Sequence, residues 1–196
     1  MKRKQKMQKT QGFYRRKAEA QLKNRQELYE WIQCFMAALM ICVLIFVYGV
    51  RLVEVIGSSM NPTLYNGEKL VVSDLFFNPK VGDIVIFKTD SYDPDRALVK
   101  RVIAVEGQTV NIDFEKGIVY VDGEEIHEDF ISELTTNKID FIGPKEVPEN
   151  CVFVMGDNRN ASIDSRDKRI GMVDKRLILG KAYFIMFPFN SAGKIR

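Results

Sequence analysis

A short segment of small residues around Ser59 is the first place in the sequence where covalent chemistry could occur. It reads Ile56-Gly57-Ser58-Ser59-Met60-Asn61-Pro62. Small side chains let backbone N–H groups approach a ligand closely, and a proline favours a turn. A serine nucleophile beside an oxyanion hole needs such a segment. Taken alone, a Gly-Ser-Ser sequence before a proline is also typical of an ordinary loop.

The second region is a strand-like run, Ala97–Val105, that contains Lys100 and Arg101 side by side. Neighbours in a strand point to opposite faces, so one of these cations must emerge among apolar residues. Burial of Lys100 would lower its pKa from about 10.4 and give a neutral amine that can accept a serine proton. Arginine stays charged and cannot do this. The alternative is a lysine whose amine reaches water along its apolar stem.

The third region is a polar loop, Met155–Arg166, directly after the apolar run Cys151–Val154. Such a loop can orient a nearby lysine through a serine hydroxyl and hold its own shape with Asp–Arg pairs. The alternative is a β-turn followed by a solvated loop.

Other kinds of site have little support in the sequence. His127 is the single histidine, so a Ser-His-Asp triad would have to use it, and its stretch EEIHED looks like a solvated hairpin edge. One histidine and one cysteine outside the apolar segment, Cys151, do not supply a usual zinc ligand set, and a Cys151 nucleophile would again need His127. Phosphate-loop and dinucleotide glycine patterns are absent. We therefore expect no metal and no cofactor.

An apolar segment, residues 31–50, precedes all three regions. Its twenty residues carry no formal charge, and as a helix they would be roughly 30 Å long, about the hydrocarbon thickness of a bilayer. The alternative of a buried core helix is disfavoured because the segment is apolar on every face and is also flanked by the charged residues Glu30 and Arg51. A cleavable signal peptide would have a shorter apolar run, and an Ala-x-Ala-like site would follow it. The segment is therefore predicted to be an uncleaved transmembrane signal-anchor helix.

The charge of the leader indicates the orientation of this span. Residues 1–30 have a net charge of +7, which leaves −4 for the rest of the chain. A nucleic-acid binder would be basic more uniformly. The positive-inside rule places residues 1–30 in the cytoplasm and residues 51–196 outside the cell membrane. The leader is predicted to be either disordered or an interfacial helix.

Residues 51–196 are predicted to form one mostly β domain with antiparallel sheets. Asp122-Gly123 between two short β-rich runs is a strong hairpin signal. Irregular loops are expected around Ser91–Asp95 and Ser132–Pro148, and one short helical turn near Pro62–Tyr65. The predicted strands are Leu70–Val72, Asp83–Phe87, Ala97–Val105, Thr109–Asp113, Ile118–Val121, Cys151–Met155 and Ala182–Phe187.

In this order, behind a single span, the three regions resemble the type I signal peptidases, Ser/Lys enzymes that remove signal peptides from exported proteins. The resemblance covers roughly residues 31–190. It rests on G-S-S-M-N-P-T-L at 57–64, G-D-I-V-I-F at 82–87, V-K-R-V-I at 99–103 and G-D-N-R-N-A-S-I-D-S-R at 156–166. One span and no large insertion make the chain more similar to the Gram-positive members.

The resemblance implies a role for individual residues. Ser59 would be the nucleophile and Lys100 the general base, while Ser162 would orient the lysine and Asp164 would support this part of the site. Some members have a serine at the position of Gly57 that lends an oxyanion donor, so backbone N–H groups, chiefly that of Ser59, would form the hole here. The structural members of the last motif would be Asp157, Arg159 and Arg166.

Two departures from the family pattern concern the last motif and the lysine segment. Asn160 and Ala161 replace the common Asp and Asn, and Ala104-Val105-Glu106-Gly107-Gln108 replaces G-x-P-G-D. These changes bear on loop rigidity and substrate preference and leave the Ser/Lys pair intact.

The resemblance also implies the partners. Substrates would be secretory preproteins with small residues, typically Ala, one and three positions before the cut, bound as an added β-strand. Ser59 lies about eight residues beyond the predicted span, so the site is expected near the lipid surface. Phe76-Phe77 and Phe184–Phe189 would contact either lipid or the core.

Three alternatives remain open in the sequence. A Ser/Lys peptidase could serve a narrow client set, such as pilin-type precursors. A catalytically silent β domain could bind surface proteins. A self-cleaving repressor-type protein would carry a DNA-binding module in place of the span.

Overall fold

The structure is a computed structural model that describes residues 24–44, 49–89 and 91–195. Its contacts divide the chain into two compact units, Met1–Tyr48 and Gly49–Arg196. Each unit is described by itself.

The first unit contains one helix, Asn24–Leu44, that is long and apolar enough to cross a membrane. Its described side chains are exposed along its whole length. The described residues are helical from Asn24 onward, so residues 24–30, which were predicted to belong to the leader, are part of this helix. Residues 1–23 of the leader and residues 45–48 of the predicted span lie outside the described residues.

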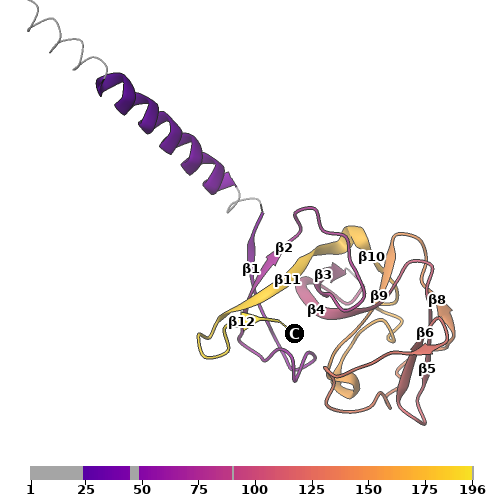
Figure 1. The fold of residues 1–196 in the computed structure, drawn as a ribbon. Helices are drawn as coiled ribbons and strands as arrows, with labels where there is room; N and C mark the ends of the chain where they lie inside the picture. The colour runs from indigo at the N-terminus through magenta and orange to yellow at the C-terminus, as the bar shows by residue number, and fades with distance from the viewer. Residues whose placement is uncertain (1–23, 45–48, 90, 196) are drawn as a thin grey trace, which may run out of the picture. The chain divides into compact units, whose positions relative to one another are not determined.

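The second unit is built around an eight-stranded sheet whose pairings are all antiparallel. The order is β1-β2-β11-β3-β4-β9-β10, and β12 also pairs with β11 (Figure 1). The strands are β1 (Arg51–Glu54), β2 (Lys69–Ser73), β3 (Ile84–Thr89), β4 (Asp93–Val105), β9 (Cys151–Met155), β10 (Val173–Asp174), β11 (Ile178–Phe187) and β12 (Gly193–Lys194).

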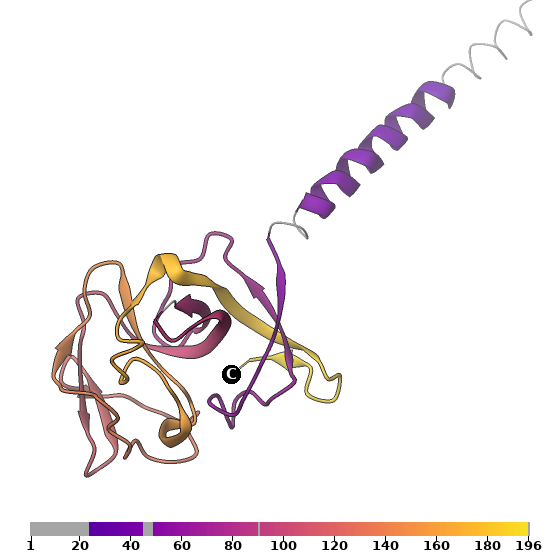
Figure 2. The same cartoon turned by 180° about the vertical axis from the view of Figure 1, so that it is seen from behind.

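A second, four-stranded sheet has the order β7-β6-β5-β8. Its strands are β5 (Thr109–Asp113), β6 (Ile118–Val121), β7 (Glu124–Glu125) and β8 (Lys145–Glu146), and single 3₁₀ turns, η1 and η2, cover Arg159–Ala161 and Lys175–Leu177. The opposite views of Figures 1 and 2 both place this sheet on the far side of the unit from β1, β2 and β12. The expected hairpin turn is confirmed, because Asp122 and Gly123 both have positive φ between β6 and β7.

The antiparallel β-fold prediction is confirmed, and two predicted loops are partly wrong. Residues 93–95 belong to β4, which reaches back to pair Asp93 with Thr89 of β3 after a bulge. Residues 145–146, inside the expected loop Ser132–Pro148, form β8 and pair with β5. In both cases a pairing with another strand decides the conformation, and local sequence preference does not record such a pairing.

The neighbouring strands β4 and β9 of the eight-stranded sheet have core on both faces. Val152 and Val154 pack with Val85 and Phe87 on one side. Phe153 packs on the other side in a second cluster with Ile103 and Phe141. This alternation follows the two-residue period of a strand, so both faces of β4 and β9 are packed and their backbone is well held for positioning a site.

Phe153 provides a test of this core. Its side chain is fully buried, and its ring meets that of Phe141 edge to face with centroids 5.9 Å apart. We expect Phe153→Ala to lower the free energy of unfolding by about 3–5 kcal/mol, because it removes a large apolar side chain and leaves a cavity. Urea denaturation of the full chain in detergent measures the change. Phe189→Ala, at a position 83% exposed, is the control, and an equal loss in both variants would contradict this description of the core.

Candidate active site

The Ser59 segment is held from both ends by the core and by a side-chain amide. Met60 and Leu64 are buried, and the Leu64 N–H donates to the Met60 carbonyl in the single helical turn that the sequence predicted. Gly57 has φ of +92°, and its N–H donates to Asn66 Oδ1 at 2.8 Å. Ser59 is left half-buried at the turn, and its backbone N–H donates to no group within the described part of the chain.

Lys100 lies in the middle of β4, opposite Val85 of β3. Its side chain is buried, with 2% exposed. The ammonium Nζ lies 2.7 Å from Ser59 Oγ and also donates to the Val99 carbonyl at 2.9 Å. The structure therefore brings together the two residues that the sequence selected from separate regions.

Burial determines the protonation of Lys100. Loss of hydration lowers the pKa of this amine from 10.5 to about 8. Asp164 and Asp157 oppose the shift through space, while Arg96 and Arg166 add to it. A lysine with this pKa is substantially neutral at mildly alkaline pH and can then accept the proton of a hydroxyl 2.7 Å away.

Arg101, the neighbour of Lys100, is also buried but is neutralised. Its Nε and Nη2 donate to both carboxylate oxygens of Asp157 at 2.9 and 2.7 Å. Thr63 Oγ1 donates to the same carboxylate at 2.5 Å. The sequence predicted that one of the two cations would face apolar surroundings. Both are buried, and only Arg101 has a directly bonded carboxylate among the described contacts.

The polar loop after β9 is organised by a second buried ion pair. Asp164 accepts two hydrogen bonds from the Arg166 guanidinium, at 2.8 and 2.9 Å. The same carboxylate accepts the Gly156 N–H at 3.0 Å. Arg166 Nη2 donates in turn to the Arg159 carbonyl at 2.6 Å. These bonds join the two ends of the loop, so its residues are held and are not a solvated turn.

Ser162 belongs to the same polar loop as Asp164 and Arg166. Its hydroxyl makes no hydrogen bond to Lys100 among the described contacts. Its Oγ is buried and has no hydrogen-bond partner among the described residues. Lys100 bonds instead to Ser59 and to the Val99 carbonyl. A role of Ser162 in orienting the lysine stays a prediction.

Arg159 and Glu128 form a contact that sequence reasoning missed. The Glu128 side chain is 8% exposed and pairs with the fully buried Arg159, although its stretch looked like a solvated hairpin edge. Arg159 also donates from Nη1 to Thr135 Oγ1 at 3.0 Å and from Nε to the Gly156 carbonyl at 3.1 Å. An acidic residue in an acidic stretch gives no signal of burial, so only the packing reveals it.

Asn160, one of the departures from the family pattern, fastens the loop to the preceding segment. Its Oδ1 accepts from Thr136 N, Thr136 Oγ1 and Asn137 N, each at 3.1 Å. Its Nδ2 donates to Glu133 Oε2 and to the Leu134 carbonyl. Every polar atom of this amide side chain is therefore bonded, and the replacement of Asp leaves the loop anchored.

A cleft of about 190 Å³ opens beside Ser59 and Lys100. Its walls come from the Ser59 segment, the first half of β4 and the polar loop. Apart from Ser59, Lys100, Arg96 and Tyr92, the lining is mostly small or aliphatic: Val55, Ile56, Gly57, Ser58, Met60, Ala97, Leu98, Val99, Ala161 and Ile163. Gly57 and Ala161, which the sequence analysis singled out, line the cleft. The buried residues Asp157, Arg159 and Arg166 are not among the lining residues.

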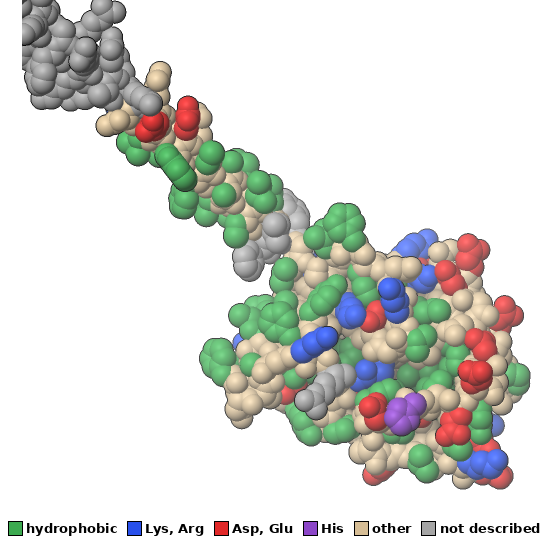
Figure 3. All heavy atoms as spheres, in the orientation of Figure 1, with side chains coloured by type: hydrophobic (Ala, Val, Ile, Leu, Met, Phe, Trp, Pro, Cys, Tyr) green, Lys and Arg blue, Asp and Glu red, His purple; other side chains and the backbone are tan. Residues whose placement is uncertain are grey.

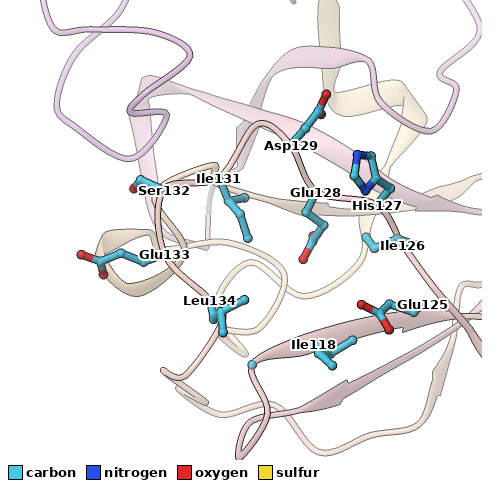
Figure 4. Close-up of a pocket in the computed structure, with 11 residues that line it drawn as sticks. Ile118, Glu125, Ile126, His127, Glu128, Asp129, Ile131, Ser132, Glu133 and Leu134 are labelled. Carbon is cyan, nitrogen blue, oxygen red and sulfur yellow. The ribbon is translucent and has the colours of Figure 1, made fainter.

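A wider hollow of about 630 Å³ lies along β7 and the loop that follows it. Figure 4 shows His127 on its rim with the carboxylates of Glu125, Asp129 and Glu133. His127 is not among the residues that line the Ser59 cleft. Within the described residues no group of acidic, histidine and cysteine side chains could hold a metal, and burial raises the pKa of the Cys151 thiol.

Comparisons with known proteins agree on one family. Residues 28–187 match the family model described as signal peptidase, peptidase S26. A signal peptidase I of Bacillus licheniformis is 35% identical over 90% of this chain and 97% of its own length. A probable signal peptidase I-1 of Synechocystis is 37% identical over 87% of this chain and 88% of its own. A crystal structure of a signal peptidase I from Enterococcus faecalis gives a TM-score of 0.45 at 27% identity, over 54% of this chain and 97% of that one.

Gly156 tests the closeness of the polar loop to Ser59. A Cβ added there would overlap Ser162 Oγ and the Ser59 carbonyl oxygen. We expect Gly156→Ala to lower kcat for preprotein cleavage by at least about tenfold, because a displacement of the order of 1 Å at a reacting group can cost about a hundredfold. Gly193→Ala, where the added methyl meets nothing within 4 Å, is the matched control. Full activity of Gly156→Ala would mean that the loop does not pack on the Ser59 segment.

Proposed function

The chain belongs to the signal peptidase family, peptidase S26, and from this we propose a type I signal peptidase with Ser59 as nucleophile and Lys100 as general base. The observation that carries the proposal is the 2.7 Å contact between Ser59 Oγ and the Nζ of a buried lysine. An exposed lysine would stay protonated and could not act as a base at neutral pH.

The proposed acylation starts from the neutral amine of Lys100. Nζ takes the proton from Ser59 Oγ as the oxygen attacks the scissile carbonyl carbon. The oxyanion accepts a hydrogen bond from the Ser59 N–H, which is free for this purpose among the described residues. Such a donor contributes roughly 3–4 kcal/mol. The Gly57 N–H is already bonded to Asn66, so it contributes no donor in this arrangement.

The collapse of the tetrahedral intermediate completes the first half-reaction. The C–N bond breaks, the Lys100 ammonium gives its proton to the leaving amine, and the acyl group remains on Ser59 Oγ. Neutral Lys100 then removes a proton from water, whose oxygen attacks the ester. That intermediate breaks down to the free carboxylate, and the proton returns to Ser59 Oγ.

Two features support an extended peptide substrate with small side chains. β4 pairs with β9 from Arg101 onward, so Ala97–Lys100 leave one edge without a strand partner among the described pairings. A substrate added to this edge as a strand would gain backbone hydrogen bonds. The narrow aliphatic cleft beside the edge suits Ala one and three positions before the cut, since alternate side chains of a strand share a face.

We further propose that the chain is a single-span protein of the cell membrane, with residues 1–30 in the cytoplasm and the β unit outside. The apolar helix and the basic leader support this orientation. The proposed substrates are secretory preproteins.

Apolar side chains on the surface of the β unit support direct contact with lipid. Phe76 is 99% exposed, and Leu52, Leu75, Phe187 and Phe189 are also exposed on or near β1, β2 and β11. Figure 3 shows such side chains gathered at this end of the unit. Phe77, in contrast, packs against the core.

The pH dependence of the rate tests the base. The neutral amine is the active form, so kcat/KM should rise about tenfold per pH unit below a pKa of about 8 and level off above it. The rate is measured from pH 6 to 10 on a preprotein in detergent–lipid micelles. Ser59→Ala and Lys100→Met should be inactive, and Lys194→Met, an exposed lysine on β12, should keep the wild-type profile. Activity in Lys100→Met would show that another group is the base.

Substitutions in the substrate test the proposed specificity. We expect Leu in place of Ala, one or three positions before the cut, to lower kcat/KM by about fivefold to a hundredfold, because overpacking a close-fitting cleft costs about 1–3 kcal/mol. Mass spectrometry of the products identifies the cut. Leu at the intervening position, whose side chain points away from the cleft, is the control. Equal cleavage of all three substrates would refute the small-residue rule.

A further inference from the structure

The cleft beside Ser59 is bridged at two points, and the second has no role in the reaction described above. At one end Lys100 Nζ meets Ser59 Oγ. At the other end Arg96 Nη2 donates to the Ile56 carbonyl at 3.4 Å. Ile56 lies three residues before Ser59, and Arg96 four residues before Lys100. The two segments therefore run side by side in the same direction, with the cleft between them.

Arg96 faces the same space as the Ser/Lys pair. It lines the cleft together with Ser59 and Lys100. A Cβ at Gly57 would lie 3.9 Å from Arg96 Nη2, so the guanidinium stands over the glycine turn that precedes Ser59. Its charge is also one of those that lower the pKa of Lys100. The position of the guanidinium therefore places a positive charge at the cleft.

This charge is available to a ligand. The Arg96 side chain is exposed, and within the described residues none of the ion pairs includes it. The arginines that support the polar loop, by contrast, are each paired with a carboxylate. Among the cleft-lining residues whose side chains the structure describes, Lys100 and Arg96 are the basic ones, and none is acidic. Because arginine keeps its charge at every working pH, this end of the cleft stays positively charged.

We propose that Arg96 is a specificity-determining residue that favours an acidic over a basic side chain in the substrate, three or four residues from the scissile bond. The inference rests on the proposed function, since it assumes that a peptide crosses the cleft as a strand. The distance follows from strand geometry: three to four residues of about 3.3 Å each separate the bridge at Ser59 from the bridge at Arg96.

The expected effect is modest because Arg96 is exposed. A solvent-exposed charge pair changes kcat/KM by about two- to fivefold, and salt screens it. When a peptide binds to Arg96, the guanidinium loses only its long 3.4 Å hydrogen bond to the Ile56 carbonyl, so this loss costs little binding free energy. A carboxylate can accept two hydrogen bonds from the guanidinium, whereas an ammonium in its place would be repelled.

The experiment uses the full chain in detergent–lipid micelles and a set of preprotein peptides. Each peptide carries Gln, Glu or Lys at one position, two to five residues on either side of the cut. For the wild type we expect kcat/KM to be higher for Glu than for Gln, and higher for Gln than for Lys, by about two- to fivefold each at a position three or four residues from the cut. The preference should shrink in 0.5 M salt. It should vanish in Arg96→Gln and reverse in Arg96→Glu.

Ratios between peptides are compared within each enzyme, so a change in the pKa of Lys100 cancels. Arg176→Gln, an exposed arginine paired with Asp174 and outside the cleft, is the matched control and should keep the wild-type preference. Cleavage of all peptides with ratios near one, or a preference that survives in Arg96→Glu, overturns the inference and leaves the proposed function standing. Failure of every variant and the wild type to cleave any peptide overturns both.

Discussion

The burial of one amine against one hydroxyl is the constraint on which the rest of this site depends. Lys100 loses nearly all of its hydration, and its closest polar partners are Ser59 Oγ and a backbone carbonyl. A neutral partner does not compensate a buried positive charge, so the charged form is disfavoured. Such a position requires rigid backbone, and β4, with β3 on one side and β9 further along the other, provides it.

The three buried arginines near Ser59 and Lys100 differ from the lysine in having carboxylate partners. Arg101, Arg159 and Arg166 are each matched by a carboxylate, from Asp157, Glu128 and Asp164 respectively. Buried ion pairs add little net stability, but loss of one partner is costly because it leaves an uncompensated charge. The pairs therefore fix the geometry of the polar loop, while their arginines stay charged and the lysine can become neutral.

Much of this arrangement could be predicted from the sequence, because it follows local rules. Alternating β-branched runs marked Thr109–Asp113, Ile118–Val121 and Cys151–Met155 with the bounds that the structure has. Residue type made Ser59 and Lys100 candidates, since a strand must turn one of two adjacent cations inward, and the family resemblance then assigned them as nucleophile and base. The start of β4 and the strand β8 could not be predicted, because their conformation depends on distant partners.

The side-chain contacts that hold the polar loop and the Ser59 segment in place could not be predicted from the sequence either. Nothing in EEIHED distinguishes Glu128, which is buried, from Glu125, which is exposed. Likewise, the spacing of Thr63 from Asp157 has no pattern, although their side chains are hydrogen-bonded. Lys100 is hydrogen-bonded to Ser59 and to the Val99 carbonyl, and the role in orienting the lysine that the family resemblance suggested for Ser162 stays a prediction.

The attachment of the polar loop to residues 128–137 has a consequence for folding. Glu128, Thr135, Thr136 and Asn137 all bond to residues of the loop. The segment that contains them connects β7 to β8 of the four-stranded sheet, so opening of that segment removes partners from Arg159, Asn160 and Arg166 together. The four-stranded sheet, the segment between β7 and β8 and the polar loop should therefore open and close as one cooperative unit, and the site persists only as long as that unit stays closed.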